Sequence, residues 1–567
     1  MTARREVGFA AAAALLGSLG AVLFLELWDA DLRVPFAYSG DATLNLTLIR
    51  SVMERGWFYD NPRLGAPDGQ HLYDYPVLSG DSLHVAFFWL AGLFTDDAAL
   101  VMNLFFLLTF PLTAVVAYLV LRRLSVAPPV ALVVAAIYTL LPYHFMRGEW
   151  HLFLAAYYVV PIGAYLALSL LDGRARIALG TGALCALVAV ASGSFYYSAF
   201  TVLLVVAASI LRFVATRERR ALAAGGFFVG VILAVSLVQL TPTILYRLKH
   251  GENDEVAQRY WFESETYGLK LTQLLLPVDD HRIDALASRK REYTEQIPQT
   301  EAREATLGVI GSVGFLWLLG VALAACVGGA RSDFFPQHRR LAALTVVAVL
   351  VGITGGLSTL LAVVWPQIRS WNRLSVFIAF FALMAVALLL EALRERFRRS
   401  APAFVALLLV LLVLGALDQT TSTFIPPYRA FKAEWQADQA SIRLVEMALP
   451  AGAKVVQLPY EPFPEPAVGA RPIYEPAKAY LHSTDLRWSW GGMRGRPEDW
   501  AAGNATKPAA ELVPAAREAG FAAILVDRLG YGDGGAAVEA DLRGVLGVEP
   551  EQTPNGRYVF WRLQAAK

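Results

Sequence analysis

The chain is short of charged residues and of cysteine. Asp, Glu, Lys and Arg make up 17% of its 567 residues, whereas a soluble domain carries roughly 25%. The formal net charge is only +1, which provides no global field for binding nucleic acid. The two cysteines, Cys185 and Cys326, stand in separate apolar stretches and form no Cys/His pattern for a structural zinc ion. These shortages exclude an ordinary soluble protein, a charge-driven nucleic-acid binder and a zinc module.

What the sequence does have is apolar stretches long enough to cross a bilayer. Hydrophobic residues make up 56% of the chain. The first stretch, Val7 to Leu27, is about 20 residues long, enough to cross roughly 30 Å of hydrocarbon. Because no small-residue cleavage site follows before Trp28, we expect a retained span rather than a signal peptide. Ten further windows lie near 98–121, 128–146, 151–171, 176–194, 196–214, 220–244, 306–327, 341–364, 374–393 and 401–418. The pattern predicts a polytopic α-helical membrane protein with about 11 transmembrane helices.

Basic residues fall in every second loop, and this alternation predicts the orientation of the chain. The basic loops hold Arg4-Arg5, Arg122-Arg123, Arg174 with Arg176, Arg217 to Arg220, Arg331 to Arg340 and Arg394 to Arg399. The other loops are longer and mixed in charge, so we expect them to face outside. An odd number of spans then places the N-terminus in the cytoplasm and the C-terminus outside.

Two parts of the chain lie outside the predicted spans. The first outer loop, 29–97, carries an expected interfacial helix from Asp41 to Arg55 and a second short apolar helix from Val85 to Phe94. Near Thr420 the composition becomes soluble in type, with buried strands expected at 454–458, 522–526 and 558–561 and a helix at 509–519. We therefore predict a transmembrane module, 1–420, and a small α/β extracytoplasmic domain, 421–567.

Asp41 is an acid between a spanning helix and an interfacial helix, close to where lipid headgroups lie. It precedes the helix predicted over 41–55, so one interpretation is a helix N-cap. The other interpretation is a general base, because a carboxylate is ionised at neutral pH and can take a proton from an acceptor hydroxyl. A single residue can do both.

Other ionisable residues gather at the outer ends of the spans, where they are costly and therefore functional candidates. His71, Tyr73 and Asp74 share the first outer loop, and Asp is also common in plain turns. Arg369 and Arg373 lie between the ninth and tenth spans and break the positive-inside pattern. A guanidinium can bind a lipid phosphate with two parallel hydrogen bonds, or it can pair with acids of the C-terminal domain.

The segment between the third and fourth spans is the densest of these groups, with His144, Arg147, Glu149 and His151. These residues are either interfacial polar ends of two spans or part of a site. The two histidines and Glu149 offer metal ligands, but their spacing is not the i, i+4 spacing of a helical metal site. A catalytic metal usually needs three protein ligands. A divalent metal is therefore left open, and no other cofactor is predicted.

Taken together, these features resemble the GT-C superfamily of membrane glycosyltransferases. The resemblance rests on an acid shortly after the first span, two short interfacial helices in the first outer loop, about 11 spans and an outer C-terminal domain. The stretches Gly40 to Phe110 and Leu141 to His144 resemble bacterial envelope members. The architectural resemblance covers roughly residues 1–420. It implies an enzyme of the plasma (bacterial inner) membrane, with Asp41 as the catalytic acid. The Trp-Trp-Asp motif of oligosaccharyltransferases is missing, since Trp488-Ser489-Trp490-Gly491 does not match it, so transfer to asparagine is not expected.

The resemblance implies an inverting glycosyltransferase that moves a sugar from a polyprenyl-phosphate carrier to an envelope glycan, lipid or protein acceptor. In our interpretation Asp41 is the base, and Asp74 or Glu149 is a second acid. We expect Arg147 and Arg373 to bind the donor phosphate. The remaining predicted substrate contacts are His71, Tyr73, His144, His151 and Arg369.

Two rival functions are kept. A flippase or transporter for a lipid-linked glycan has a similar number of spans, but it predicts acids and arginines along a path through the bilayer. Here the ionisable residues cluster on one face, and the spans are nearly free of charge. A polysaccharide polymerase or ligase has similar outer arginines and differs mainly in using a pyrophosphate-linked donor.

Overall fold

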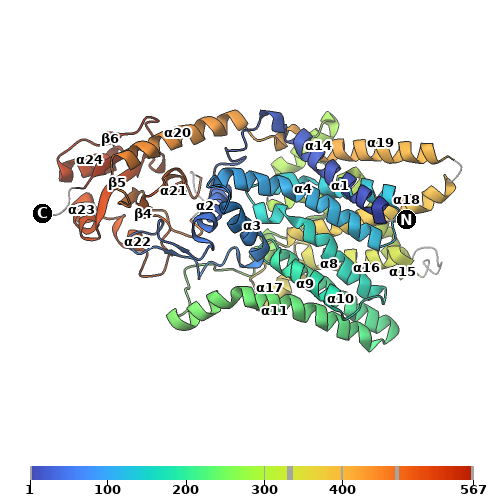
Figure 1. The fold of residues 1–567 in the computed structure, drawn as a ribbon. Coiled ribbons are helices and arrows are strands. Elements are labelled where there is room, and N and C mark those ends of the chain that lie inside the picture. The colour runs from blue at the N-terminus through green and yellow to red at the C-terminus, as the bar shows by residue number, and fades with distance from the viewer. Residues whose placement is uncertain (1–2, 299, 328–335, 398–399, 467–471, 564–567) are drawn as a thin grey trace.

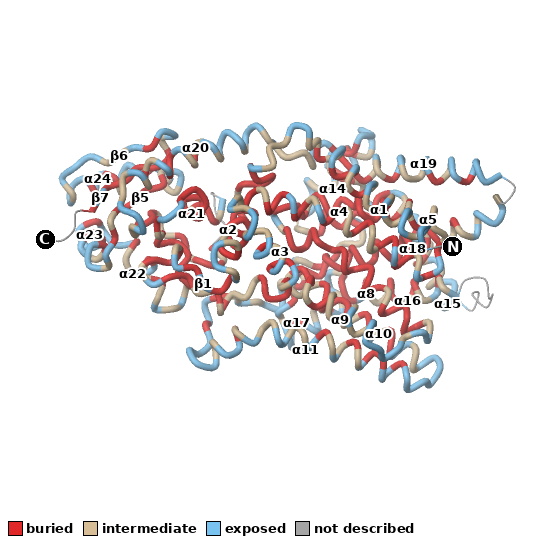
Figure 2. The backbone as a smooth tube through the Cα atoms, viewed as in Figure 1, coloured by how far each residue is buried: buried red, intermediate tan, exposed pale blue. Residues whose placement is uncertain are grey.

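The computed structural model describes residues 3–298, 300–327, 336–397, 400–466 and 472–563. The molecule is elongated, with apolar helices gathered at the end that holds the N-terminus and a small sheet at the end that holds the C-terminus (Figure 1). Buried residues run from the centre of the helices through the junction and into the sheet (Figure 2). The predicted class, a polytopic helical protein with a small α/β C-terminal part, is confirmed.

Among the described residues, nine helical segments are long and apolar enough to cross a membrane. They are α1 (Ala3–Phe24), α4 (Ala98–Arg123), α5 with α6 (Pro128–Arg147), α7 with α8 (Leu152–Leu171), α10 (Tyr196–Thr216), α11 (Arg219–His250), α15 (Gly308–Cys326), η5 with α18 (Trp371–Arg396) and α19 (Ala401–Gln419). Each coincides with one of the predicted windows.

The other two predicted windows form shorter helices. The window 176–194 gives α9 (Leu179–Val190), whose 12 residues extend only about 18 Å. The chain turns directly after it, because Gly193, Ser194 and Phe195 all have left-handed backbones. The window 341–364 divides into α16 (Pro336–Gly352) and α17 (Leu357–Val364) around Gly355, which has φ +71°. The turn after α9 lies at the predicted boundary between 176–194 and 196–214, but apolar composition revealed neither the shortness of α9 nor the division of 341–364.

The two short helices expected in the first outer loop are present as α2 (Gly40–Arg55) and α3 (Ser82–Gly92). Between them lies a small hairpin of β1 (Asp60–Asn61) and β2 (Gln70–His71). Most of α2 is buried on all sides, polar Thr43 and Thr47 included. It packs against α3, α4 and α21 and lies between the helices and the sheet (Figure 1). The expected interfacial helix is therefore an internal one, because the C-terminal part covers it.

The outer segment between α11 and α15 consists of short helices. They are α12 (Glu263–Thr266), α13 (Leu271–Leu275), α14 (Asp284–Gln296) and the 3-10 turn η4 (Glu301–Ala305). Contacts of η4 with α6 and η5 bring this segment against the outer ends of two spans.

The C-terminal part begins with the long helix α20 (Tyr428–Met447) and holds a mixed sheet. In the described residues this sheet has the order β4-β3-β5-β7-β6, with β3 parallel to β4 and β5, and β7 antiparallel to β5 and β6. The strands are β3 (Lys454–Leu458), β4 (Arg487–Trp488), β5 (Phe521–Asp527), β6 (Glu551–Gln552) and β7 (Tyr558–Arg562), and the helices are α21 (Ala477–His482), α22 (Trp500–Asn504), α23 (Ala509–Glu518) and α24 (Ala536–Leu546). The three predicted strands and the predicted helix are confirmed.

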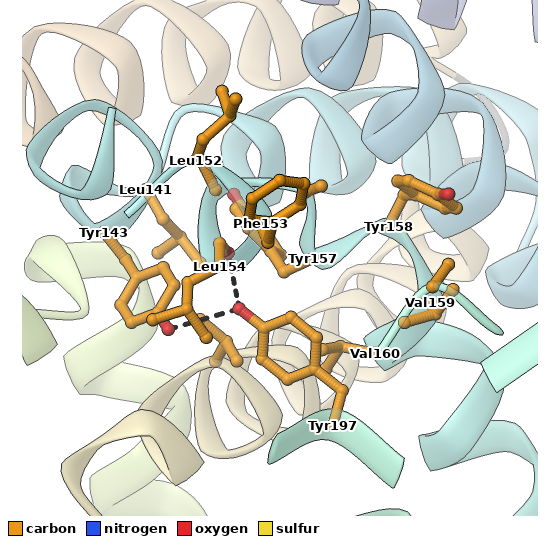
Figure 3. Close-up of a cluster of buried hydrophobic side chains, with 14 of the residues drawn as sticks. Leu141, Tyr143, Leu152, Phe153, Leu154, Tyr157, Tyr158, Val159, Val160 and Tyr197 are labelled. Carbon is orange, nitrogen blue, oxygen red and sulfur yellow. Dashed lines mark hydrogen bonds between the residues drawn. The ribbon is translucent and has the colours of Figure 1, made fainter. Parts of the chain in front are cut away.

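An aromatic cluster supports the short helices α6 (Pro142–Arg147) and α7 (Leu152–Ala155). The Tyr143 hydroxyl lies 3.2 Å from that of Tyr197 on α10, and the Tyr197 hydroxyl donates to the Leu154 carbonyl (Figure 3). Both tyrosines are buried. Because their hydroxyls are paired inside an apolar cluster, the backbone of residues 143–154 is held in one place. The polar segment 147–151 is therefore supported by a closely packed aromatic cluster.

Candidate active site

Asp41 lies in the first turn of α2, after Gly40. Ser39 is the residue at the N-cap position, so the N-cap interpretation does not describe Asp41. Gly40 has φ +56°, and a Cβ there would lie 2.7 Å from the Trp150 ring. Only glycine therefore fits at this position. The Asp41 side chain is 45% exposed, which leaves it accessible to a substrate.

Residues 36–38, which precede Asp41, make hydrogen bonds to three separate parts of the molecule. The Phe36 amide donates to Asn103 of α4 at 3.3 Å, and the Ala37 amide donates to Glu149 at 2.9 Å. The Tyr38 hydroxyl lies 2.7 Å from His482 Nε2 in the C-terminal part. Both the membrane-spanning helices and the C-terminal part therefore fix the position of Asp41.

His151 links Asp41 to an acid from a distant loop. Its Nε2 lies 3.8 Å from Asp41 Oδ2 and 3.9 Å from Glu301 Oε1. Burial, aided by the charge of Arg147, lowers the pKa of His151 to about 3. The imidazole is therefore neutral at pH 7 and lies beside the Asp41 carboxylate without adding a charge.

Glu301 of η4 bridges two buried arginines. Its Oε2 lies 2.9 Å from Arg147 Nη1 and 3.1 Å from Arg373 Nη2. Arg147 also pairs with Glu304 at 2.8 Å, and Arg373 stacks on the Tyr196 ring at 4.1 Å. Burial alone would raise the pKa of Glu301, but Arg373 and Arg147 hold it well below its usual range. Glu301 is thus a permanent anion between two cations.

Partial burial and the charges around Asp41 together set its pKa. Burial is the largest cause and, with the nearby Glu301 and Glu465, it raises the pKa of Asp41 to about 6, against the lowering effect of Arg373 and Arg369. Arg369 itself pairs with Glu263 of α12 at 2.9 Å. At neutral pH the carboxylate is mostly ionised, yet it binds a proton far more readily than an ordinary aspartate. Such a pKa suits a general base.

The structure brings some of the predicted site residues together and separates others. His151 connects Asp41 to Glu301, and Glu301 pairs with both Arg373 and Arg147. The charge of Arg369, which pairs with Glu263, also acts on Asp41. His144 lies in the protein interior, bonded to Thr109 and Thr139 and stacked on Phe110 at 3.7 Å.

The predicted residues of the first outer loop lie in contacts of their own. Asp74 is buried and accepts two hydrogen bonds from Arg496, at 2.7 and 2.9 Å. His71 and Tyr73 both bind Asp60, at 2.6 and 2.7 Å. We place these three residues outside the candidate site. Glu149 is buried as well, and it faces a separate cavity.

Sequence reasoning missed the acids that pair with the outer arginines. It expected lipid phosphate or acids of the C-terminal domain, whereas Glu263, Glu301 and Glu304 all come from the segment between α11 and α15. A usable signal was present, since Glu301-Ala302-Arg303-Glu304 directly precedes a span. Across the described parts of the chain, no group of three or more His, Cys, Asp and Glu side chains suited to holding a metal ion is found.

The apolar helices, with a cluster of charges at their ends, define a multi-pass membrane protein. A family model described as a domain of unknown function, DUF6311, matches residues 62–420, and the chain belongs to this family. No curated protein matches the sequence significantly.

Solved structures similar to this chain are those of the oligosaccharyltransferase of Archaeoglobus fulgidus. The apo form has a TM-score of 0.46 at 14% identity, covering 99% of this chain and 74% of that one. The complex with Zn and sulfate has a TM-score of 0.45 at 13% identity, covering 98% and 73%. The complex with an inhibitory peptide and a dolichol-phosphate has a TM-score of 0.39 at 13% identity, covering 99% and 74%.

Proposed function

We propose that the protein is an inverting glycosyltransferase of the GT-C type that takes a sugar from a polyprenyl-phosphate carrier. The observation that carries the proposal is the half-exposed Asp41 carboxylate, which His151 and Glu301 connect to Arg373. The charges of Arg373 and Arg369 both act on this carboxylate. A base and a phosphate-binding cation side by side are what transfer from a sugar phosphate requires. The site belongs on the outer face of the plasma membrane, with the N-terminus in the cytoplasm.

The proposed reaction is a single displacement. Asp41 takes the proton of an acceptor hydroxyl as the acceptor oxygen forms its bond to the anomeric carbon. The bond from that carbon to the phosphate oxygen breaks, and the polyprenyl phosphate leaves with both electrons. One displacement inverts the configuration at the anomeric carbon, so no covalent sugar-enzyme intermediate is needed.

The leaving phosphate gains negative charge, which a nearby guanidinium stabilises. Arg373 and Arg369 act on the charge of Asp41, so they are the better placed arginines for this role. Arg147 is fully buried between Glu301 and Glu304. We therefore assign Arg147 the task of holding Glu301, and Arg373 and Arg369 the task of binding phosphate. The acceptor, whether glycan, lipid or protein, would approach from the C-terminal part.

The test is transfer from a radiolabelled polyprenyl-phosphate sugar by the protein in proteoliposomes. Asp41→Asn removes the base but keeps the shape, and turnover is expected to fall by about 10² to 10⁴. Asp68→Asn is the matched control, since Asp68 is an exposed acid of the same outer loop. Undiminished turnover by a folded Asp41→Asn protein would remove Asp41 as the base.

A further inference from the structure

A cavity of about 500 Å³ lies behind the segment that carries the candidate site, within the range of roughly 300–1,000 Å³ usual for ligand pockets. Glu149 and Trp150 line it, whereas Arg147 and His151, on either side of them in sequence, contact Glu301. The backbone at 148–151 therefore separates the cavity from Asp41.

The walls of the cavity are apolar and lie at the outer ends of the spans. Leu25 follows the end of α1, Phe106 comes from α4, and Phe145 comes from α6. Phe424, from the linker between α19 and α20, stacks on Phe145 with ring centroids 4.9 Å apart. Such walls suit a hydrocarbon chain, because burying it removes apolar surface from water.

One buried polar atom in this cavity lacks a partner. Glu149 is 2% exposed, and its Oε2 accepts from the Ala37 amide. Its Oε1 is buried and makes no hydrogen bond of normal geometry to a described residue, and the Phe36 amide lies near the carboxyl group. Burial raises the pKa of Glu149 to about 8, so at neutral pH the group is mostly a carboxylic acid with a proton to donate. Leaving a buried polar atom unpaired is unfavourable, which favours a ligand with an acceptor at this position.

The rim of the cavity carries one acid and one base, Asp279 and Arg303. Arg303 is exposed and makes no ion pair with any residue that the structure describes. Asp279 is partly exposed and lies 3.9 Å from Lys290. A free guanidinium and a partly exposed carboxylate on the same cavity match a head group with a phosphate and an amine better than a purely anionic one.

We propose that the cavity holds one acyl chain of an amine-bearing phospholipid from the bilayer, with its ester carbonyl at Glu149 and its phosphate at Arg303. This lipid is not the sugar donor, because the segments 36–40 and 148–151 separate it from Asp41. The proposal therefore stands whether or not the protein transfers sugars. A lipid there would pack against the same segments that position Asp41.

The experiment uses the full chain, stripped of lipid in detergent, with a phosphatidylethanolamine that carries a diazirine on one acyl chain. Irradiation should label peptides that contain 145–150 or 423–431. Met146→Trp fills the cavity and should lower labelling about tenfold, an affinity loss of about 1.4 kcal/mol. Met447→Trp, an exposed methionine on α20, should change nothing. Ile425→Trp fills the cavity from the linker between α19 and α20. It replaces Met146→Trp as the test variant if that protein does not fold.

Two further arms identify the head group. Arg303→Ala should weaken labelling about threefold, the effect of an exposed ion pair, whereas Arg289→Ala, an exposed arginine of α14, should not. Labelling that is spread over the lipid-facing helices, or that is equal in the filled variants, would overturn the proposal. Displacement of the probe by polyprenyl phosphate at lower concentrations than by unlabelled phosphatidylethanolamine would overturn it in favour of the carrier lipid.

Discussion

Partial burial and neighbouring charges, more than its own helix, determine the pKa of the Asp41 carboxylate. Arg373 and Arg369 favour its ionised form, whereas burial and Glu301 disfavour it. The imidazole of His151 lies 3.8 Å away and stays neutral. The result is a carboxylate with a pKa of about 6 on a half-exposed side chain, and this value has a measurable consequence.

We predict that transfer depends on the ionised form of Asp41, so kcat/KM falls as the pH decreases through about 6. Well below that pH the rate should drop about tenfold per pH unit, because the fraction of carboxylate does so. The measurement is a pH profile of kcat/KM from pH 4.5 to 8, with thermal unfolding followed at each pH as a control. An inflection near pH 4, the ordinary value for aspartate, would contradict the assigned environment.

At the scale of elements, the short turn η4 connects two spans through ion pairs. It supplies Glu301 and Glu304 to arginines on two different spans. In the proposed reaction, the donor phosphate and Glu301 compete for the Arg373 guanidinium.

We predict that Glu301→Gln lowers the melting temperature of the free protein, since it leaves Arg147 and Arg373 short of a partner. Breaking a buried ion pair costs about 3–5 kcal/mol. Added polyprenyl phosphate should restore more stability to the variant than to the wild type, because the phosphate meets less competition. The control is Glu292→Gln, an exposed acid of α14. Equal ligand-induced shifts in the variant and the wild type would argue against a phosphate at Arg373.

The sequence allowed the spans, α2, α3 and the three main strands to be predicted, because each depends on a local apolar pattern. It also singled out Asp41, His151, Arg369 and Arg373, which share the outer ends of the spans. It did not predict that Asp74 pairs with Arg496 or that Arg147 pairs with Glu301. These partners are brought together by loops far apart in the chain, and no periodicity records such contacts. The turn at 193–195 falls where the windows 176–194 and 196–214 meet, whereas the break at Gly355 was missed because apolar residues continue on both sides of it.

At the scale of the whole molecule, the spans and the C-terminal part are joined by buried charges. Asp74 of the first outer loop binds Arg496 and lies 3.7 Å from Arg247 at the end of α11. Tyr38 binds Asp438 of α20 as well as His482. The sheet is thus connected to the same loop that carries Asp41.

We predict that Asp74→Asn destabilises the protein by about 3–5 kcal/mol, because Arg496 is left buried without its anion. Asp60→Asn, in the same loop but half exposed, should cost less than about 1 kcal/mol. Denaturant unfolding measures both, and the pH profile of folded Asp74→Asn should match that of the wild type. A variant that is stable but inactive would make Asp74 the second catalytic acid.

The most direct test of the central claim is a cryo-electron microscopy structure with a polyprenyl-phosphonate sugar, a donor analogue that cannot react. The account predicts that the phosphonate lies about 3 Å from the guanidinium of Arg373 or Arg369, with the anomeric carbon facing Asp41. A phosphonate bound in the cavity at Glu149, or among the spans away from Asp41, would contradict it.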